Sequence, residues 1–183
     1  MSGIKYSLRQ ESTSFSIGTT NLRSSNGSLI DTNGCVALLV LSGFAVATIN
    51  FEKRILRKGD FVLLFYDSTF SMLSISAAFS VRYVSFAYHL IEEAIYKPLS
   101  INFWNTIYSN PVFRPNERDF KLLVEWWYQM EWVNNIKDYD YQEEILKNNI
   151  RNLLVATDIE IMDHAGDSLR NSRGHAWVPG NRF

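Results

Sequence analysis

Cysteine and histidine are scarce in this sequence. Cys35 is the only cysteine, so no disulfide can form within the chain, and a lone thiol fits a reducing compartment. The three histidines, His89, His164 and His175, lie far apart, and none belongs to a His-x-His pair. A metal site in a small β-barrel needs two or three histidines and a carboxylate that converge from neighbouring strands. We therefore expect no bound metal and no cofactor.

Long apolar runs and an excess of positive charge are also missing. The longest apolar stretch, 35–49, is interrupted by polar residues and is too short to cross a bilayer. The first twenty residues are polar and lack the apolar core of a signal peptide. Segment 111–165 carries six basic and eleven acidic side chains, so phosphate would repel it. These features predict a soluble, cytoplasmic protein that contacts neither membrane nor DNA.

Catalytic motifs are absent as well. Cys35 opens an apolar run, where a small buried thiol is the usual role of cysteine. Glu92 and Glu93 are adjacent, and neighbouring residues point to different faces of a helix, which favours solvated side chains. Segments 42–44 and 58–60 each hold one glycine and are turns rather than a Gly-rich phosphate loop. We predict that the chain is not an enzyme.

Short β-branched and aromatic runs fill residues 34–110, and aromatic residues make up 14% of the chain. Six strands are predicted, at 35–41, 44–50, 51–56, 61–66, 70–76 and 79–88. Their spacing is typical of an antiparallel sandwich or barrel. The run 61–65 is apolar at every position, so one face would fill the barrel and helices would cover the other. Short helices are predicted at 90–96 and 100–108.

Helical periodicity replaces the strands over residues 111–165. Asn116 is placed as the N-cap of a helix over 116–134, because acidic residues follow it in the first turn. A second helix over 139–164 is expected to end at Gly166. That helix carries an apolar stripe close to heptad spacing, which is the candidate dimer interface: Leu146, Ile150, Leu153, Thr157 and Ile161.

The two ends of the chain are polar. Residues 1–33 form an N-terminal arm in which Phe15 and Ile17 alternate with small residues. This pattern fits one short edge strand, and a mobile arm fits equally well. Residues 166–183 are expected to form a linker or tail.

Several aromatic residues and one arginine of the β-rich part are candidates for lining a ligand cavity. They are Phe44, Tyr66, Arg82, Tyr83, Tyr88 and Trp104. Each aromatic residue also fits a packed core. Arg82 lies within an apolar strand, on the same face as Val84 and Phe86. Facing inward, it needs a ligand anion or an internal acid such as Asp60 or Asp67; facing outward, it needs neither.

The order of these parts resembles the N-terminal sensor region of AraC-type transcriptional regulators. The matching stretch is 34–164, and within it the segments LVLSG at 39–43 and LRKGDFVLL at 56–64 resemble the family pattern. The run 79–89 resembles the strand that leads into the family's helices. Residues 66–68 depart from the family pattern, because the family often has a proline near this point.

The resemblance implies an α+β fold: a cupin-like double-stranded β-helix at 34–110, followed by a dimerising helical hairpin at 111–165. It implies a homodimer with a small-molecule effector inside the barrel. The aromatic candidates and Arg82 suit a sugar or a carboxylate-bearing effector. The DNA-reading half of such regulators would be absent from this chain. The alternatives are a cupin-fold enzyme and an interaction domain whose barrel is filled by its own side chains.

Overall fold

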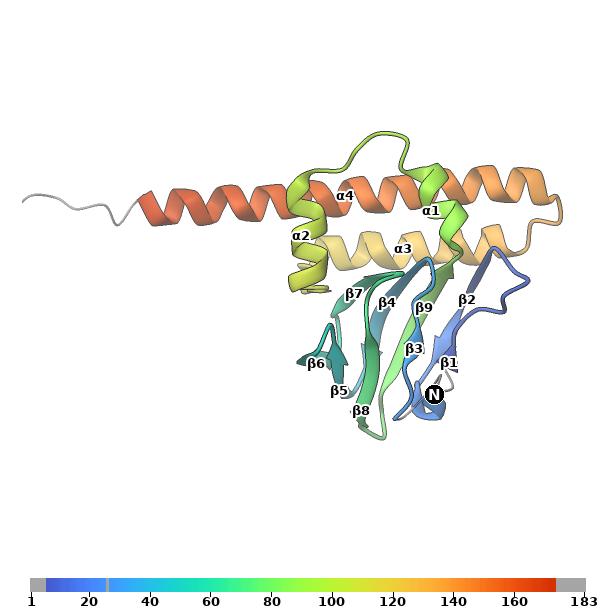
Figure 1. Ribbon diagram of the computed structural model, residues 1–183, viewed down its shortest axis with the longest axis horizontal. Coiled ribbons are helices and arrows are strands. Elements are labelled where there is room, and N and C mark those ends of the chain that lie inside the picture. The colour runs from blue at the N-terminus through green and yellow to red at the C-terminus, as the bar shows by residue number, and fades with distance from the viewer. Residues whose placement is uncertain (1–5, 26, 174–183) are drawn as a thin grey trace, which may run out of the picture.

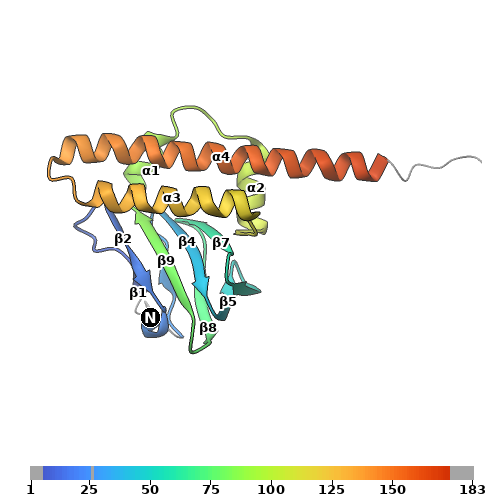
Figure 2. The same cartoon turned by 180° about the vertical axis from the view of Figure 1, so that it is seen from behind.

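The computed structural model describes residues 6–25 and 27–173, which form strands covered on one side by helices (Figure 1). The strands are β1 (Tyr6–Ser7), β2 (Phe15–Thr20), β3 (Ile30–Asp31), β4 (Cys35–Ser42), β5 (Phe44–Ile49), β6 (Glu52–Arg57), β7 (Phe61–Phe65), β8 (Phe70–Ile75), β9 (Ser80–Phe86) and β10 (Val112–Phe113). The helices are α1 (Tyr88–Ala94), α2 (Ile101–Ser109), α3 (Glu117–Asn134) and α4 (Tyr139–Arg173), with a 3₁₀ turn at Arg23–Ser25. Helices α3 and α4 run side by side above the strands in both views (Figures 1 and 2).

Two antiparallel sheets carry the fold. The larger has the strand order β10-β7-β4-β9-β2, and the smaller has the order β6-β5-β8. A short parallel pair, β1 and β3, lies beside them. The expected α+β class with antiparallel strands is therefore present, but the described strands form separate sheets and no closed barrel.

Alternation along the strands of the larger sheet creates two cores. Residues Cys35, Ala37 and Leu39 of β4 pack toward the helices, whereas Val36 and Leu38 pack toward the smaller sheet. Strand β7 divides in the same way, as expected for a run that is apolar on both faces.

The space between the sheets is filled by side chains of the protein itself. Among the residues that are completely buried there are Leu22, Val36, Leu38, Val62, Leu64, Phe70 and Met72. Close packing of this kind leaves little room for a ligand.

The predicted cap of α3 is confirmed. Asn116 Oδ1 accepts a hydrogen bond from the backbone N–H of Asp119 at 3.0 Å, which satisfies one of the free donors at the helix start. The predicted end of α4 is wrong, since the helix continues through Gly166 to Arg173. One helical glycine costs only about 1 kcal/mol relative to alanine, which is too little to end a helix. Residues 174–183 lie outside the described part.

The N-terminal segment contributes to the core. Residues 15–20 form β2, which pairs with β9 at the edge of the larger sheet, so the predicted edge strand is confirmed. Leu8, Leu22 and Ile30 are buried between the sheets, which ties residues on both sides of β2 to the body of the protein. Among the described residues, no helix is long and apolar enough to cross a membrane.

Candidate functional site

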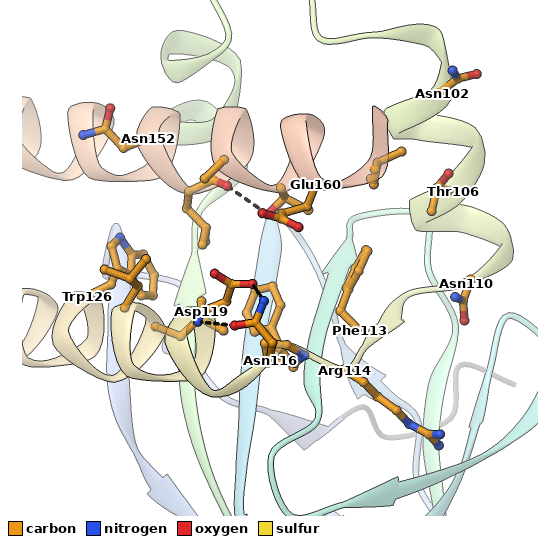
Figure 3. Close-up of a pocket in the computed structure, with 18 of the residues that line it drawn as sticks. Asn102, Thr106, Asn110, Phe113, Arg114, Asn116, Asp119, Trp126, Asn152 and Glu160 are labelled. Atoms are coloured by element: carbon orange, nitrogen blue, oxygen red, sulfur yellow. Dashed lines mark hydrogen bonds between the residues drawn. The ribbon is translucent and has the colours of Figure 1, made fainter. Parts of the chain in front are cut away.

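A cavity of about 850 Å³ lies between α2, the start of α3 and the middle of α4 (Figure 3). Phe61 of β7 and Phe113 of β10 form part of its lining from the side of the larger sheet. The cavity is thus in the helical layer, outside the packed space between the two sheets.

Helix α2 forms one wall of the cavity and is fixed at both ends. At its start, Ser100 caps the helix by accepting from the backbone N–H of Phe103 at 3.1 Å, and Ser100 also binds Asp158 of α4. At its end, Asn50 Nδ2 donates to the Tyr108 carbonyl at 3.0 Å and Arg54 donates to the Ser109 carbonyl at 2.7 Å. The wall is therefore formed before any ligand arrives.

Apolar side chains from α3 and α4 supply much of the lining. They are Leu122, Leu123 and Trp126 of α3 and Leu153, Ala156 and Ile161 of α4. Leu122 is 53% exposed, an unusual state for a leucine unless something covers it. Such a surface suits the apolar body of a small molecule.

Neutral polar side chains surround this apolar surface. Asn102, Asn105 and Thr106 come from α2, and Asn152 comes from α4. An amide can both donate and accept hydrogen bonds, so these groups can orient a ligand without selecting its charge. Thr157 also lines the cavity, but its hydroxyl already donates to the Leu153 carbonyl at 2.9 Å.

Three charged residues of the described part line the cavity. Asp119 and Glu160 approach it from opposite sides, from α3 and α4 (Figure 3). The third, Arg114, extends away from the helices (Figure 3). Its Nε lies 3.5 Å from Oδ1 of the buried Asp60. Asp60 therefore compensates the positive charge, while both acids face the gap between the helices.

The structure separates the six residues predicted to contact an effector. Tyr66 and Tyr88 form an edge-to-face pair with ring centroids 5.1 Å apart, and both rings are partly exposed. A hydrogen bond with Glu92 raises the pKa of the Tyr88 phenol. Trp104 packs instead against Phe65 and Phe103, with centroids 5.1 and 5.0 Å away.

The other three candidates lie on different surfaces. Arg82 shares the face of Val84 and Phe86, as predicted, but that face meets the helices. The guanidinium carbon of Arg82 lies 4.9 Å from the centre of the Tyr128 ring of α3. Tyr83 packs at the edge of the core between the sheets, and Phe44 is 56% exposed. None of the six lines the cavity of the helical layer.

The candidate dimer stripe of α4 is buried within the protomer. Leu146 and Ile150 are each 1% exposed, and Leu153, Thr157 and Ile161 are no more than 8% exposed. The four apolar members belong to the core beneath the helices. In this conformation the stripe is not available to a second copy of the chain.

Sequence reasoning missed the cavity because its lining comes from separate helices with no shared motif. One local signal pointed to it. Asn102, Asn105 and Thr106 share one face of α2, a polar strip beside the apolar Phe103 and Ile107. Among the described residues, no group of three or more His, Cys, Asp or Glu side chains is arranged to hold a metal ion.

No protein-family model matches the sequence, and no curated protein matches it. A solved structure does share the fold. Apo ToxT K231A from Vibrio cholerae strain SCE256 aligns with a TM-score of 0.54 and 16% identity, over 84% of this chain and 59% of that chain. Wild-type ToxT from the same strain, bound to an unsaturated fatty acid, gives a TM-score of 0.48 at 16% identity, over 84% of this chain and 57% of that chain.

The chain thus spans 59% of the length of the ToxT chain that it matches, a coverage consistent with an N-terminal domain. At this level of identity the comparison shows the fold alone. ToxT is an AraC-family regulator, so the resemblance inferred from the sequence is confirmed at the level of the fold.

Proposed function

We propose that this chain is the sensor domain of an AraC-type transcriptional regulator, and that its small-molecule effector binds in the cavity between α2, α3 and α4. The observation that carries the proposal is a largely apolar cavity of about 850 Å³. Its size lies within the range of known ligand pockets, about 300–1,000 Å³. ToxT, whose apo form shares the fold, has also been solved with a bound unsaturated fatty acid.

Packing favours this cavity over the space between the sheets. The cupin-like interior expected from the sequence is occupied by buried side chains such as Leu38, Leu64 and Met72. Effector contact by Phe44, Tyr66, Arg82, Tyr83, Tyr88 and Trp104 stays a prediction. An Arg82→Met variant that stays folded but loses the rise in Tm caused by the effector would support it.

The dimer would form through the outward face of α4. Ile159 and Met162 lie three residues apart on a face different from the buried stripe. Ile159 is 48% exposed and Met162 is 45% exposed. Two copies of such a face, related by a two-fold axis, would cover each other.

Contact with DNA is assigned to a separate DNA-binding half. The helical segment 111–165 carries eleven acidic and six basic side chains, which disfavours contact with phosphate. The rival proposal is an interaction domain without an effector, which the filled space between the sheets favours.

A cavity-filling variant separates these two functions. Ala156 is exposed on α4 and lines the cavity, so Ala156→Trp should block the cavity without disturbing the core. Glu144→Trp, at an exposed position of α4 away from the cavity, is the matched control. A library of small metabolites is screened by the thermal unfolding of each protein. An effector at 100 times its Kd stabilises the folded state by about 2.7 kcal/mol.

We expect at least one compound to raise the Tm of the wild type and of Glu144→Trp but not of Ala156→Trp. If every stabilising compound acts equally on Ala156→Trp, the effector does not bind in this cavity. If no compound raises the Tm, the interaction domain is the better description.

A further inference from the structure

The charges that line the cavity restrict the ligand it can accept. Asp119 and Glu160 face the gap between α3 and α4 from opposite sides (Figure 3). Neither carboxylate takes part in an ion pair among the described residues. Asp119 Oδ2 accepts one hydrogen bond, from Asn116 Nδ2 at 2.6 Å, and that donor is neutral. Neither carboxylate is therefore paired with a cationic side chain of the described residues.

The positive charge that lines the cavity is already paired with an acid. Among the side chains that the structure describes, Arg114 is the one cationic member of the lining, and it is paired with Asp60, which lies outside the lining. Asp60 is 3% exposed and also accepts from the backbone N–H of Arg57 at 2.8 Å, so it is fixed in place. Releasing Arg114 for a ligand would leave the buried carboxylate without its cation, which is costly.

The remaining surface is apolar or neutral. Leu122, Leu153 and Ala156 offer an apolar wall, and Asn102, Asn105 and Asn152 offer amides. A ligand that matches both parts has an apolar body and a positive end. A carboxylate would be repelled by the two acids, and the electrostatic cost grows as the site loses water.

We infer that the effector is a cationic amphiphile: an alkyl- or arylammonium compound, whose positive group lies between Asp119 and Glu160 and whose apolar body lies against Leu122, Leu153 and Ala156. This inference rests on the proposed function and narrows it to one ligand class. It assigns Glu160 as a residue that determines ligand charge.

Three probes with the same body and different head groups test the inference. Octylamine, octanol and octanoate are titrated into the protein at pH 7.5, and binding is measured by calorimetry. We expect octylamine to bind at least about tenfold more tightly than octanoate, since the two carboxylates attract one head group and repel the other. Octanol should lie between them.

Charge reversal supplies the decisive variant. Glu160 is exposed, so Glu160→Lys should fold normally, and Glu144→Lys is the matched control on the same helix. Glu160→Lys should reverse the order, so that octanoate binds more tightly than octylamine, while Glu144→Lys should keep the wild-type order. Ala156→Trp should weaken the binding of all three probes.

The outcomes separate the ligand class from the proposed function. If octanoate or octanol binds more tightly than octylamine, and Ala156→Trp abolishes that binding, the cavity is the effector site but the cationic class is wrong. The class is also wrong if Glu160→Lys leaves the order unchanged. If none of the three probes binds the wild type with a millimolar Kd or better, both the class and the cavity site are overturned.

Discussion

Ser100 and Asp158 join two helices that are far apart in the sequence. The backbone N–H of Ser100 donates to Asp158 Oδ2 at 2.9 Å, and the Ser100 hydroxyl donates to Asp158 Oδ1. Asp158 is 8% exposed, so its carboxylate depends on these two donors. The pair holds the start of α2 against α4, and both helices form walls of the cavity.

Removal of this carboxylate should loosen α2. We expect Asp158→Ala to lower the free energy of unfolding by about 2–3 kcal/mol, because two hydrogen bonds to a charged group are lost. Ser100→Ala removes the helix cap and one of these bonds and should cost about 1–2 kcal/mol. Urea unfolding measures both, and the double variant should cost less than the sum because the two residues interact directly. An unchanged midpoint for Asp158→Ala would show that α2 does not need this contact.

Two glycines with positive φ should differ in their tolerance of alanine. A Cβ at Gly34 (φ +103°) would lie 1.9 Å from the carbonyl oxygen of Phe86. At Gly59 (φ +91°) a Cβ would meet no heavy atom within 4 Å. We expect Gly34→Ala to lower the free energy of unfolding by more than about 4 kcal/mol, and Gly59→Ala to cost about 1–2 kcal/mol from backbone strain alone. Equal losses for the two variants would contradict the clash at Gly34.

Local signals predicted the elements of this fold well. The Asn116 cap depends on a side chain three residues from its partner Asp119, so the sequence around it contains the whole interaction. The run 61–65 likewise predicted burial on both faces. The prediction that α4 ends at Gly166 was wrong, because the continuation of a helix depends on the residues around a glycine as well as on the glycine itself.

Long-range placement was beyond the sequence. Alternation put Arg82 on the correct face of β9 but did not show that a helix carrying Tyr128 covers that face. The stripe through Ile150 was identified as apolar, but periodicity does not say whether the same chain or a second copy buries it. The cavity combines Asn105, Leu122 and Ala156 from three helices, and no single segment carries that pattern.

The single thiol should be a probe of unfolding. Cys35 is 1% exposed, and burial raises the pKa of its thiol well above the ordinary value, so almost no reactive thiolate exists near neutral pH. We expect Cys35 to resist a thiol reagent such as DTNB in the native protein and to react within minutes in concentrated urea. Rapid labelling of the native protein would mean that β4 opens locally.

The β5–β6 hairpin carries strain that one substitution should relieve. Ile49 pairs with Glu52, and between them Asn50 (φ +49°) and Phe51 (φ +65°) both have positive φ. Such two-residue turns favour Asn-Gly. Phe51 is 87% exposed, so Phe51→Gly should lose little packing and raise the free energy of unfolding by about 1 kcal/mol. Phe51→Ala is the control, since it removes the ring but keeps the strain and should give no such gain.

Variants at two isoleucines on opposite faces of α4 test folding and association separately. Ile150 is 1% exposed in the core beneath the helices, and Ile159 is 48% exposed on the outward face. We expect Ile150→Asp to prevent stable folding, because an unpaired carboxylate would be buried. Ile159→Asp should keep the wild-type circular dichroism and Tm of an isolated protomer, because its side chain remains in water.

Sedimentation of the wild type and Ile159→Asp at tens of micromolar then tests the proposed dimer. The wild type should sediment as a dimer and Ile159→Asp as a folded monomer, since two aspartates would meet across the two-fold axis. Glu144→Asp, an exposed change on the same helix that leaves this face intact, should stay dimeric. A dimer that survives Ile159→Asp must use another surface, and a wild type that is monomeric at these concentrations has no such dimer. If Ile150→Asp is folded but monomeric, the dimer forms instead through the stripe that contains Leu146 and Leu153. The helical layer would then have to open before two copies meet.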